Sequence, residues 1–594
     1  MTDRAFLNVE RSATGRRWVS RLQDTRIALA ISQRHDLPEI VGRVLAGRGV
    51  EVEQAEAFLN PTIRTLMPQP SALRDMEKGA SRLADAIMAG EPIGVISDYD
   101  VDGVSSAALL LRFLRATGSE AIVHIPDRIT EGYGPSLAAV ANLKARGVSL
   151  LMTLDCGVTA HDPLAHAAEL GLTAIIVDHH LAGEILPQAH AVINPNRQDD
   201  LSGLGYLCAA GVTMMLIAAV NRLLRQRGHY GEAHREPNML QWLELVALAT
   251  VCDVVPLKGL NRAYVSQGLK VMARRANPGL AALADIARLK RQPDCHALGF
   301  MLGPRLNAAG RIGSAVLAFE LLVTEDKAEA NRLAQELERL NRERQVIEMR
   351  VVDQAVIQAE QAMGAERRPA VLMVTGEGWH PGVAGLAASR LKERFGLPSF
   401  ALAFPKGGLE ASGSGRSIAG VDLGSAVQAA FAAGLIVKGG GHAMAAGLTV
   451  EVARLGELRA FLDQRLGPQV AKADNRSLAI DGALTAGGAT LDLIELLEQA
   501  GPYGAGHPSP LFAFPAHRVL YADRAGSDHI RLTLASDDGK RIKAISFRSM
   551  GTPLGELLLS ERSFPIHVAG RLCVDDWGSA RVPSLHIEDA APLA

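Results

Sequence analysis

Three aspartates at alternate positions, Asp98, Asp100 and Asp102, are the residues whose spacing most directly indicates chemistry. They lie in ISDYDVDGVSS, where an apolar run ends and Gly103 leads into a helix-like segment. Carboxylates this close together repel one another unless cations sit among them. The pattern favours a metal site, and the alternative is a solvated acidic turn that caps a helix.

Further carboxylates and two histidines follow later apolar runs. Asp155 ends LLMTLD, the triplet Asp178 to His180 ends AIIVDHH, and Asp253 precedes Pro256 in LVALATVCDVVPL. Imidazole and carboxylate together suit divalent ions such as Mn, Fe or Zn, although Asp253 alone could simply cap a helix. This is the inventory of a two-metal hydrolytic centre, in which a shared carboxylate bridges ions about 3.5–4 Å apart and a phosphoester is cleaved.

The elements that must position these residues are short strands and helices in alternation. Between residues 92 and 193, β-branched runs such as IGVIS, EAIVHI and AIIV alternate with segments such as SSAALLLRFLRAT. This predicts an α/β domain with a parallel sheet covered by helices on both faces. Ligands of open α/β sheets bind at the carboxyl ends of the strands, where these acidic residues fall.

The remaining segments predict further domains. Residues 325–363 contain helix formers with apolar residues three and four apart, which predicts one long connecting helix with a solvated charged face. A second α/β unit begins at Ala370 and includes KGGGHAMAAGL. After about residue 471, shorter alternating runs predict a small all-β, OB-like domain.

Composition bounds the class of protein. The 594 residues exceed one hydrophobic core, and 48% hydrophobic with 21% charged residues is typical of a globular protein. A net charge of -2 requires any polyanion site to be local. The five cysteines form no CxxC pair, and the N-terminus lacks the pattern of a signal peptide, so we expect a cytoplasmic protein. The apolar run 205–220 is too short to span a bilayer, so we expect it to form a buried helix in a non-membrane protein. Without a self-complementary helical seam, we expect a monomer.

DYDVDG, the strand-end Asp155, DHH at residues 178–180 and VCDVVPL resemble, in order and spacing, the motifs of the DHH phosphoesterase superfamily. The resemblance implies that the metal ligands are Asp100, Asp102, Asp155, His179 and Asp253, with Asp155 as the bridge. Asp98 would be an additional ligand or a support of the site. His180 would face the scissile phosphate, and Asp178 would orient its neighbour, so the catalytic residues would be Asp155, Asp178 and His180.

Several other segments resemble the RecJ exonucleases within this superfamily, over nearly the whole chain. The substrate-binding residues implied are Arg128 and Tyr133 in HIPDRITEGYGP, Arg305, Asn307 and Arg311 in GPRLNAAGRIG, Ser414 and Arg416 in SGSGRSI, and Gly440, Gly441 and His442 in GGGHAMAAG. Arginine in a Gly- or Ser-rich turn suits a phosphate, and Arg305 and Arg416 are the preferred ligands of a 5′-terminal phosphate, with Ser414 assisting. The alternatives are arginines that tie loops together and a glycine run that is a bare hinge. For base stacking, Tyr133, Tyr503, Phe512 and Trp577 are available, although packing would explain any one of them.

The resemblance implies a single-strand-specific 5′→3′ DNA exonuclease that uses two Mn or Mg ions and acts in recombination and repair. It also implies single-stranded-DNA-binding protein and recombination helicases as partners. We expect residues 1–70 to be an N-terminal segment packing on the core, 71–324 the DHH catalytic domain, 325–364 the connecting helix, 365–470 a DHHA1 substrate-binding domain and 471–594 an OB-like domain that binds single-stranded DNA. The alternatives are a DHH hydrolase acting on short RNA, cyclic dinucleotides or pyrophosphate, and a non-catalytic DNA-binding scaffold.

Overall fold

The computed structural model describes residues 4–232, 234–364, 368–473, 477–560, 564–575 and 581–593. It contains two compact units, one formed by Leu66–Asp474 and the other by Met1–Thr65 together with Asn475–Ala594. No helix within the described residues combines the length and the apolar character needed to cross a lipid bilayer.

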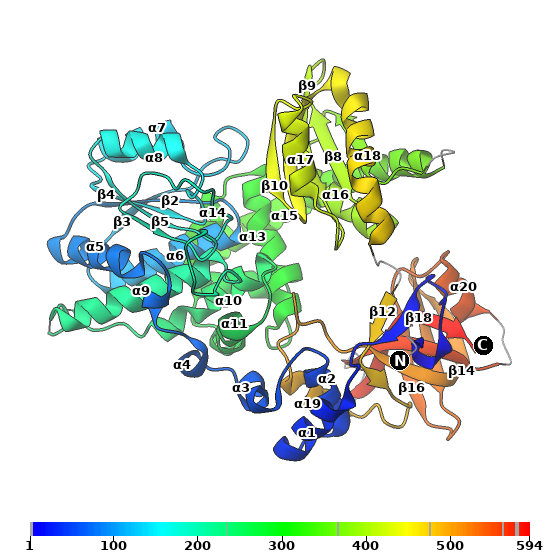
Figure 1. Cartoon of the computed structure of the whole chain (residues 1–594). Coiled ribbons are helices and arrows are strands. Elements are labelled where there is room, and N and C mark those ends of the chain that lie inside the picture. The colour runs from blue at the N-terminus through cyan, green and yellow to red at the C-terminus, as the bar shows by residue number, and fades with distance from the viewer. Residues whose placement is uncertain are drawn as a thin grey trace. The chain divides into compact units, whose positions relative to one another are not determined.

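The first sheet is the predicted parallel one. Its strands stand in the order β3 (Ala121–His124), β2 (Ile93–Ser97), β4 (Leu150–Leu154), β5 (Thr173–Val177) and β6 (Ala191–Ile193). One face packs against α7 (Leu137–Ala145) and α8 (His161–Glu169), and the other against α5 (Met76–Ala89), α6 (Val101–Ala116) and α9 (Ala209–Gln226) (Figure 1). Every residue of β2 and β4 is buried because both faces are covered.

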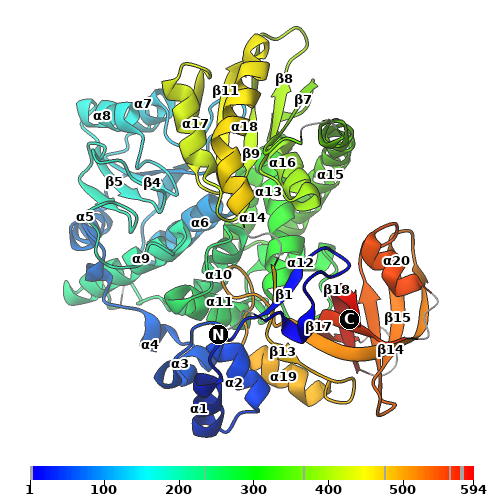
Figure 2. The same cartoon turned by 45° about the vertical axis from the view of Figure 1, so that its right-hand side comes forward.

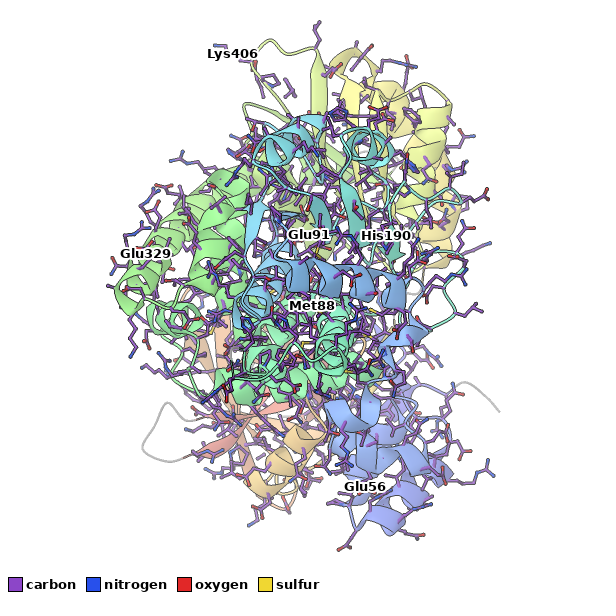
Figure 3. All side chains as sticks on the ribbon, turned by 90° about the vertical axis from the view of Figure 1, so that its left-hand side faces the viewer. Glu56, Met88, Glu91, His190, Glu329 and Lys406 are labelled. Carbon is purple, nitrogen blue, oxygen red and sulfur yellow. The ribbon has the colours of Figure 1, made fainter. Side chains whose placement is uncertain are left out.

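The helices around this sheet also separate core from solvent. The buried helix expected at residues 205–220 is α9, which begins at Ala209. Met88 lies on the outer side of α5 and is exposed (Figure 3). The sheet therefore has an apolar interior, and its polar residues gather at the strand ends.

A helical region follows the sheet and ends in the predicted connecting helix. It comprises η4 (Met239–Trp242), α10 (Leu243–Cys252), α11 (Gly259–Met272), α12 (Pro278–Ile286), the π-helix η5 (Ala297–Leu302), α13 (Gly303–Ile312), α14 (Val316–Val323) and α15 (Lys327–Met363). Asp326 caps α15 by accepting from the Glu329 N–H at 2.7 Å. The charged face of α15 is not solvated throughout, because Arg344 and Glu348 are buried.

The second sheet has the order β10 (Lys438–His442), β11 (Ala445–Glu451), β9 (Glu410–Arg416), β8 (Ser399–Phe404) and β7 (Leu372–Glu377). Strands β7 and β8 are parallel and the other pairs are antiparallel. Helices α15 and α16 (Pro381–Phe395) cover one face, and α17 (Leu423–Ala432) and α18 (Leu455–Lys472) cover the other (Figure 2). Strand β10, which carries the glycine run, is an edge strand.

The C-terminal unit is the predicted OB-like barrel. Its strands are β12 (Ser477–Ile480), β13 (Gly482–Ala483), β14 (Phe512–Ala525), β15 (His529–Ala535), β16 (Arg541–Ser546), β17 (Ile566–Asp575) and β18 (Val582–Pro592). Pairing of β14 with both β15 and β17 closes β14, β15, β16, β18 and β17 into a barrel. Helices α19 (Leu491–Gln499) and α20 (Pro553–Leu559) pack against it.

The N-terminal segment shares the core of this barrel. It contains β1 (Arg17–Ser20), α1 (Thr25–His35), α2 (Glu39–Ala46), α3 (Ala55–Leu59) and α4 (Ile63–Leu66). Strand β1 pairs in parallel with β12, and Trp18 donates from Nε1 to Asp589 at 3.0 Å. Residues of α1 and α2 join Phe512 and Phe514 in one hydrophobic cluster. The core on which the N-terminal segment packs is therefore that of the barrel, a pairing that the sequence did not indicate.

Candidate metal centre and substrate-binding residues

The parallel strands bring the predicted acidic residues together. Strands β2, β4 and β5 end at Ser97, Leu154 and Val177, and the next residues are Asp98, Asp155 and Asp178. Because carboxyl ends of parallel strands share one edge of the sheet, these side chains meet there. All three aspartates are buried.

Two helix N-termini hold the other carboxylates of the first motif. Asp100 caps α6 by accepting from the N–H groups of Asp102 at 2.9 Å and Gly103 at 3.2 Å. Asp102 accepts from Ala209 at 2.7 Å and Ala210 at 2.8 Å, the first residues of α9, where a helix dipole favours negative charge. Gly103 is required here, because a Cβ would lie 2.3 Å from the Asp98 carbonyl oxygen.

Asp155 adopts a backbone conformation that few non-glycine residues adopt. Its φ is +60°, in the left-handed region. The Tyr133 hydroxyl donates to the Asp155 carbonyl oxygen at 2.9 Å, and its ring meets the His180 ring edge-on at 5.6 Å. Tyr133 therefore braces the loop that presents the Asp155 carboxylate.

His179 lies among three carboxylates. Its Nε2 is 3.3 Å from Asp155 Oδ1 and 3.7 Å from both Asp102 Oδ2 and Asp253 Oδ2. Burial lowers the pKa of His179 despite these neighbours, which favours the neutral imidazole that binds metals. Asn196 donates to the His179 carbonyl oxygen at 2.6 Å.

Asn194 and Asn196, from INPN after β6, were missed in the sequence. Asn194 is buried and donates to the His180 carbonyl oxygen at 2.8 Å, so the two amides fix both histidines of the motif. A polar segment directly after an apolar strand was the only sequence signal available.

The ligand atoms form three overlapping groups, and within each group they lie within 4.8 Å of one another. The groups are Asp98, Asp100 and Asp155; Asp102, His179 and Asp253; and Asp155, His179 and His180. Asp155 belongs to the first and third groups, and His179, whose Nε2 lies 3.3 Å from Asp155 Oδ1, belongs to the second and third. This central place is the one that a bridging carboxylate needs. The three groups bring together all the ligands that the sequence predicted, Asp98 included.

Unpartnered oxygens indicate that cations belong here. Within the described part of the chain, Asp98 Oδ1, Asp155 Oδ1 and Asp253 Oδ2 are buried without a hydrogen-bond partner. Burial, followed by repulsion from neighbouring carboxylates, raises the pKa of all three side chains well above its ordinary value. Buried carboxylates this crowded are costly unless cations pair with them. The oxygen-rich donor set with one imidazole fits Mn²⁺ or Mg²⁺.

Asp178 serves as a hub of hydrogen bonds. It accepts from the N–H groups of Val158 at 3.0 Å, His179 at 2.7 Å and His180 at 3.1 Å, and from His180 Nδ1 at 2.8 Å. Burial alone would raise the pKa of Asp178, but these hydrogen bonds outweigh it and lower the pKa.

His180 is the residue that Asp178 orients. Burial opposes the charged form of His180, but the hydrogen bond to Asp178 prevails and raises the pKa of His180 to about 9. With Nδ1 engaged and the side chain 46% exposed, Nε2 is the nitrogen left for a substrate.

Three of the predicted substrate-binding residues form a basic cluster, which we define as Arg128, Arg311 and Arg416. The Arg128 guanidinium lies over the Tyr99 ring at 5.0 Å. Burial, and then the charges of Arg128 and Arg416, lower the pKa of Arg311 to about 10. Arg311 donates to the Gly382 carbonyl oxygen at 3.1 Å and Arg416 to that of Gly415 at 2.9 Å, and no carboxylate among the described residues pairs with either. The basic cluster can therefore bind an anion.

The structure corrects the expected setting of these arginines. Arg305, Asn307 and Arg311 lie in helix α13, and Arg416 ends strand β9, so none occupies the predicted glycine- or serine-rich turn. Ser414 lies two residues before Arg416, on the same side of β9. A Cβ at Gly385 of α16 would lie 2.8 Å from Arg416 Nη2 and 3.5 Å from Ser414 Cβ.

Arg305 and Asn307 have internal partners. Arg305 donates to Glu338 of α15 at 2.7 Å and to the Met301 carbonyl oxygen at 2.6 Å. Asn307 Oδ1 accepts from the Val101 N–H at 3.2 Å, which holds the first turn of α6. These contacts favour Arg311 over Arg305 as a phosphate ligand and give Asn307 a role in positioning the metal-binding loop.

The glycine run lies on the exposed edge strand β10. A Cβ at Gly440 would meet no described atom within 4 Å, whereas one at Gly441, with φ +145°, would lie 2.4 Å from the Ala445 carbonyl oxygen. Burial, followed by the charges of Arg416 and His180, lowers the pKa of His442. An open strand edge beside these cations suits a phosphate backbone.

The expected stacking residues are largely unavailable. Phe512 is fully buried, Tyr503 donates to the Leu497 carbonyl oxygen, and Trp577 lies outside the described residues. Phe300 and Phe547, which the sequence did not single out, are 73% and 51% exposed.

Comparisons with known proteins agree with this architecture. Residues 92–250 match the DHH family N-terminal domain, residues 368–467 the DHHA1 domain and residues 480–589 the RecJ OB domain. The single-stranded-DNA-specific exonuclease RecJ of Salmonella typhimurium is 36% identical over 94% of this chain and 96% of its own length. RecJ of Escherichia coli is 37% identical over 84% of this chain and 86% of its own.

Solved structures agree as well. The crystal structure of RecJ in complex with Mn²⁺ from Thermus thermophilus superposes with a TM-score of 0.78 at 26% identity, covering 96% of this chain and 78% of that one. A Mg²⁺ complex from the same organism gives a TM-score of 0.73 at 25% identity, covering 96% and 77%. With relatives above 30% identity over nearly their whole length, this chain belongs to the RecJ family of DHH proteins.

Proposed function

We propose that this protein is a single-strand-specific DNA exonuclease that removes nucleotides from the 5′ end by phosphodiester hydrolysis, in DNA recombination and repair. The observation that carries the proposal is the cluster of three overlapping carboxylate and histidine groups, linked by Asp155 and His179. Two Mn²⁺ or Mg²⁺ ions bound there would supply Lewis-acid activation of water and of the scissile phosphate. The similar proteins of Salmonella typhimurium and Escherichia coli are single-stranded-DNA-specific exonucleases, which supports the same activity and substrate.

The side chains around the metal centre have distinct roles in this proposal. His180, held by Asp178 through Nδ1, donates a hydrogen bond from Nε2 to the scissile phosphate. Tyr133 positions the loop that carries Asp155, and Asn307 positions the segment that carries Asp100 and Asp102.

The contacts to the strand come from the second sheet, from α13 and from the segment after β3. Arg311 and Arg416, with Arg128 and Ser414, hold the 5′-terminal phosphate, so that hydrolysis begins at that end. Gly440 and Gly441 let the phosphate backbone approach main-chain N–H groups, and His442 adds a side-chain contact.

The domain limits proposed from the sequence complete this account. The catalytic domain is residues 71–324, the connecting helix 325–364, the DHHA1 domain 365–470 and the barrel 471–594, with the barrel binding single-stranded DNA. A cytoplasmic monomer that works with single-stranded-DNA-binding protein and recombination helicases belongs to the same proposal. Co-purification with these partners and light scattering test those points.

The first experiment is digestion of 5′-phosphorylated, 3′-labelled single-stranded DNA with Mn²⁺. Its arms are the duplex form, the 5′-hydroxyl form, EDTA in place of Mn²⁺, and Asp155→Asn. Stepwise loss from the 5′ end, absent with EDTA and in the variant and weak on the duplex, is expected. Tight binding by the wild type without cleavage would overturn the proposal and favour a scaffold.

A further inference from the structure

A cavity of about 550 Å³ lies among η5, α13, α15 and α16, and the metal ligands do not account for its lining. We call it the Phe300 pocket. Among the described residues its charged lining consists of Arg305, Arg311, Arg344, Arg390 and Glu348. Its apolar lining includes Phe300, Met349, Val352 and Leu386. The pocket thus combines an excess of positive charge with an apolar wall.

The pocket adjoins the candidate metal centre through residues next to the metal ligands. Cys252, which precedes the metal ligand Asp253, lines it, and so does Asn307, whose Oδ1 holds the Val101 N–H at 3.2 Å. Arg311 belongs both to this lining and to the basic cluster. A strand whose phosphate occupies the metal centre would therefore have a neighbouring nucleotide within reach of the pocket.

Phe300 is placed as a platform in this pocket. It lies in the π-helix η5, and such helices often mark functional sites. The His296 ring stacks on it with centroids 5.1 Å apart and planes 26° apart. Because the side chain is nevertheless 73% exposed, the face opposite His296 is open. An open aromatic face stacks well on a nucleobase.

Two arginines of the pocket, Arg344 and Arg390, share contacts with Glu348. Arg344 pairs with Glu348 and donates to Asn341 at 2.6 Å, and Arg390 lies 3.5 Å from the same glutamate. A guanidinium has five donors, so these contacts leave others for a phosphate. Cations beside an aromatic wall fit a nucleotide better than they fit an apolar ligand, which would leave the guanidinium groups unpaired.

We propose that the Phe300 pocket receives one unpaired nucleotide of the substrate strand, with its base stacked on Phe300 and its phosphate near the arginines. The inference rests on the proposed function, because the metal centre must first hold the strand. It makes Phe300 a determinant of single-strand specificity. A base in a duplex is paired and stacked on its neighbours, so it would have to leave the helix to enter.

The test combines Phe300→Ala with a series of 5′-phosphorylated single strands, each carrying one abasic site moved stepwise from the 5′ end. In the wild type, the abasic site at the position that occupies the pocket should raise KM about tenfold. Phe300→Ala should raise KM for the intact strand by a similar factor and remove the penalty at that position only. Phe300→Leu should behave like Phe300→Ala, since it retains bulk but not the aromatic face. Leu409→Ala, at a residue 83% exposed outside the pocket lining, is the control and should match the wild type.

The outcomes separate the two proposals. A wild type that fails to degrade the intact strand would overturn the proposed function. Degradation with the same KM and the same abasic profile in wild type and Phe300→Ala would overturn the pocket assignment alone. Equal melting temperatures of the variants and the wild type, with and without Mn²⁺, establish that fold and metal centre are intact.

Discussion

The Tyr133 hydroxyl donates a hydrogen bond of 2.9 Å to the carbonyl oxygen of Asp155, whose carboxylate belongs to two of the three candidate ligand groups. Asp155 holds a left-handed backbone, with φ at +60°. Such a conformation costs of the order of 1 kcal/mol or more and persists only when its surroundings fix it. The bond thus couples a residue outside the ligand set to the geometry of the metal centre.

We expect Tyr133→Phe to lower kcat about tenfold and to weaken Mn²⁺ binding, while the free energy of unfolding falls by only about 1 kcal/mol. The edge-on contact between the two rings remains, and only the hydroxyl is lost, together with its 3.1 Å contact with His180 Nδ1. Single-turnover kinetics and Mn²⁺ titration measure these effects. Tyr521→Phe, which removes an exposed hydroxyl bonded to Asp523, is the control. An unchanged metal affinity in Tyr133→Phe would show that the hydroxyl does not position Asp155.

Removal of the metal ions should show how much the repulsion between the buried carboxylates lowers the stability of the folded protein. Asp155 Oδ1 is buried without a hydrogen-bond partner among the described residues, and four other aspartates repel this carboxylate. In EDTA we therefore expect Asp155→Asn to be more stable than the wild type, by about 2 kcal/mol. In Mn²⁺ the order should reverse, because binding stabilises only a protein that retains its ligands.

Thermal unfolding in EDTA and in Mn²⁺ measures both effects. Asp523→Asn, an exposed carboxylate in the barrel, should follow the wild type in both conditions. A destabilised Asp155→Asn protein in EDTA would mean that the carboxylate supports the fold rather than a metal.

Local sequence patterns predicted the first sheet and the connecting helix correctly. Apolar runs ending in Asp98, Asp155 and Asp178 specified the sheet and its polar edge, and the pattern at residues 325–363 specified α15. Periodicity determines which face of an element is apolar, and a strand end determines where a side chain emerges.

Pairings between distant residues were not predictable in this way. Arg305 meets Glu338 on another helix, and Asn196 reaches back to His179. Phe512 occupies a core that α1 and α2 help to build from the other end of the chain. Each contact depends on tertiary packing, about which the sequence near each residue carries no information.

Arg416 and Arg305, the two arginines that the sequence analysis preferred as ligands of a 5′-terminal phosphate, differ in their hydrogen-bond partners. Arg416 has no carboxylate bonded to it within the described part of the chain, whereas Arg305 is bonded to Glu338. We expect Arg416→Ala to raise KM for a 5′-phosphorylated strand roughly 10- to 100-fold, because a charge-assisted hydrogen bond to the phosphate is lost. KM for the 5′-hydroxyl strand should stay nearly unchanged. Arg305→Ala should mainly lower stability and preserve the preference for a 5′-phosphate. Steady-state kinetics on the two strands checks this, and loss of that preference in Arg305→Ala alone would reverse the assignment.

Glu244 gives a stability prediction that does not depend on the metal centre. This side chain is buried at the start of α10, and burial raises its pKa to about 7, although the charge of Arg112 opposes the shift. Because the folded protein holds the proton more tightly than the unfolded chain, stability falls as pH rises from about 4.5 to about 7 and then stays reduced.

Glu244→Gln removes the ionisation, so at pH 8 it should raise the free energy of unfolding by about 3 kcal/mol, and near pH 5 by less than about 1 kcal/mol. Urea unfolding at the two pH values measures the difference, and Glu325→Gln, at an exposed carboxylate that pairs with the same Arg112, is the control. Equal effects of Glu244→Gln at both pH values would mean that Glu244 is ionised in the folded protein at pH 5 already.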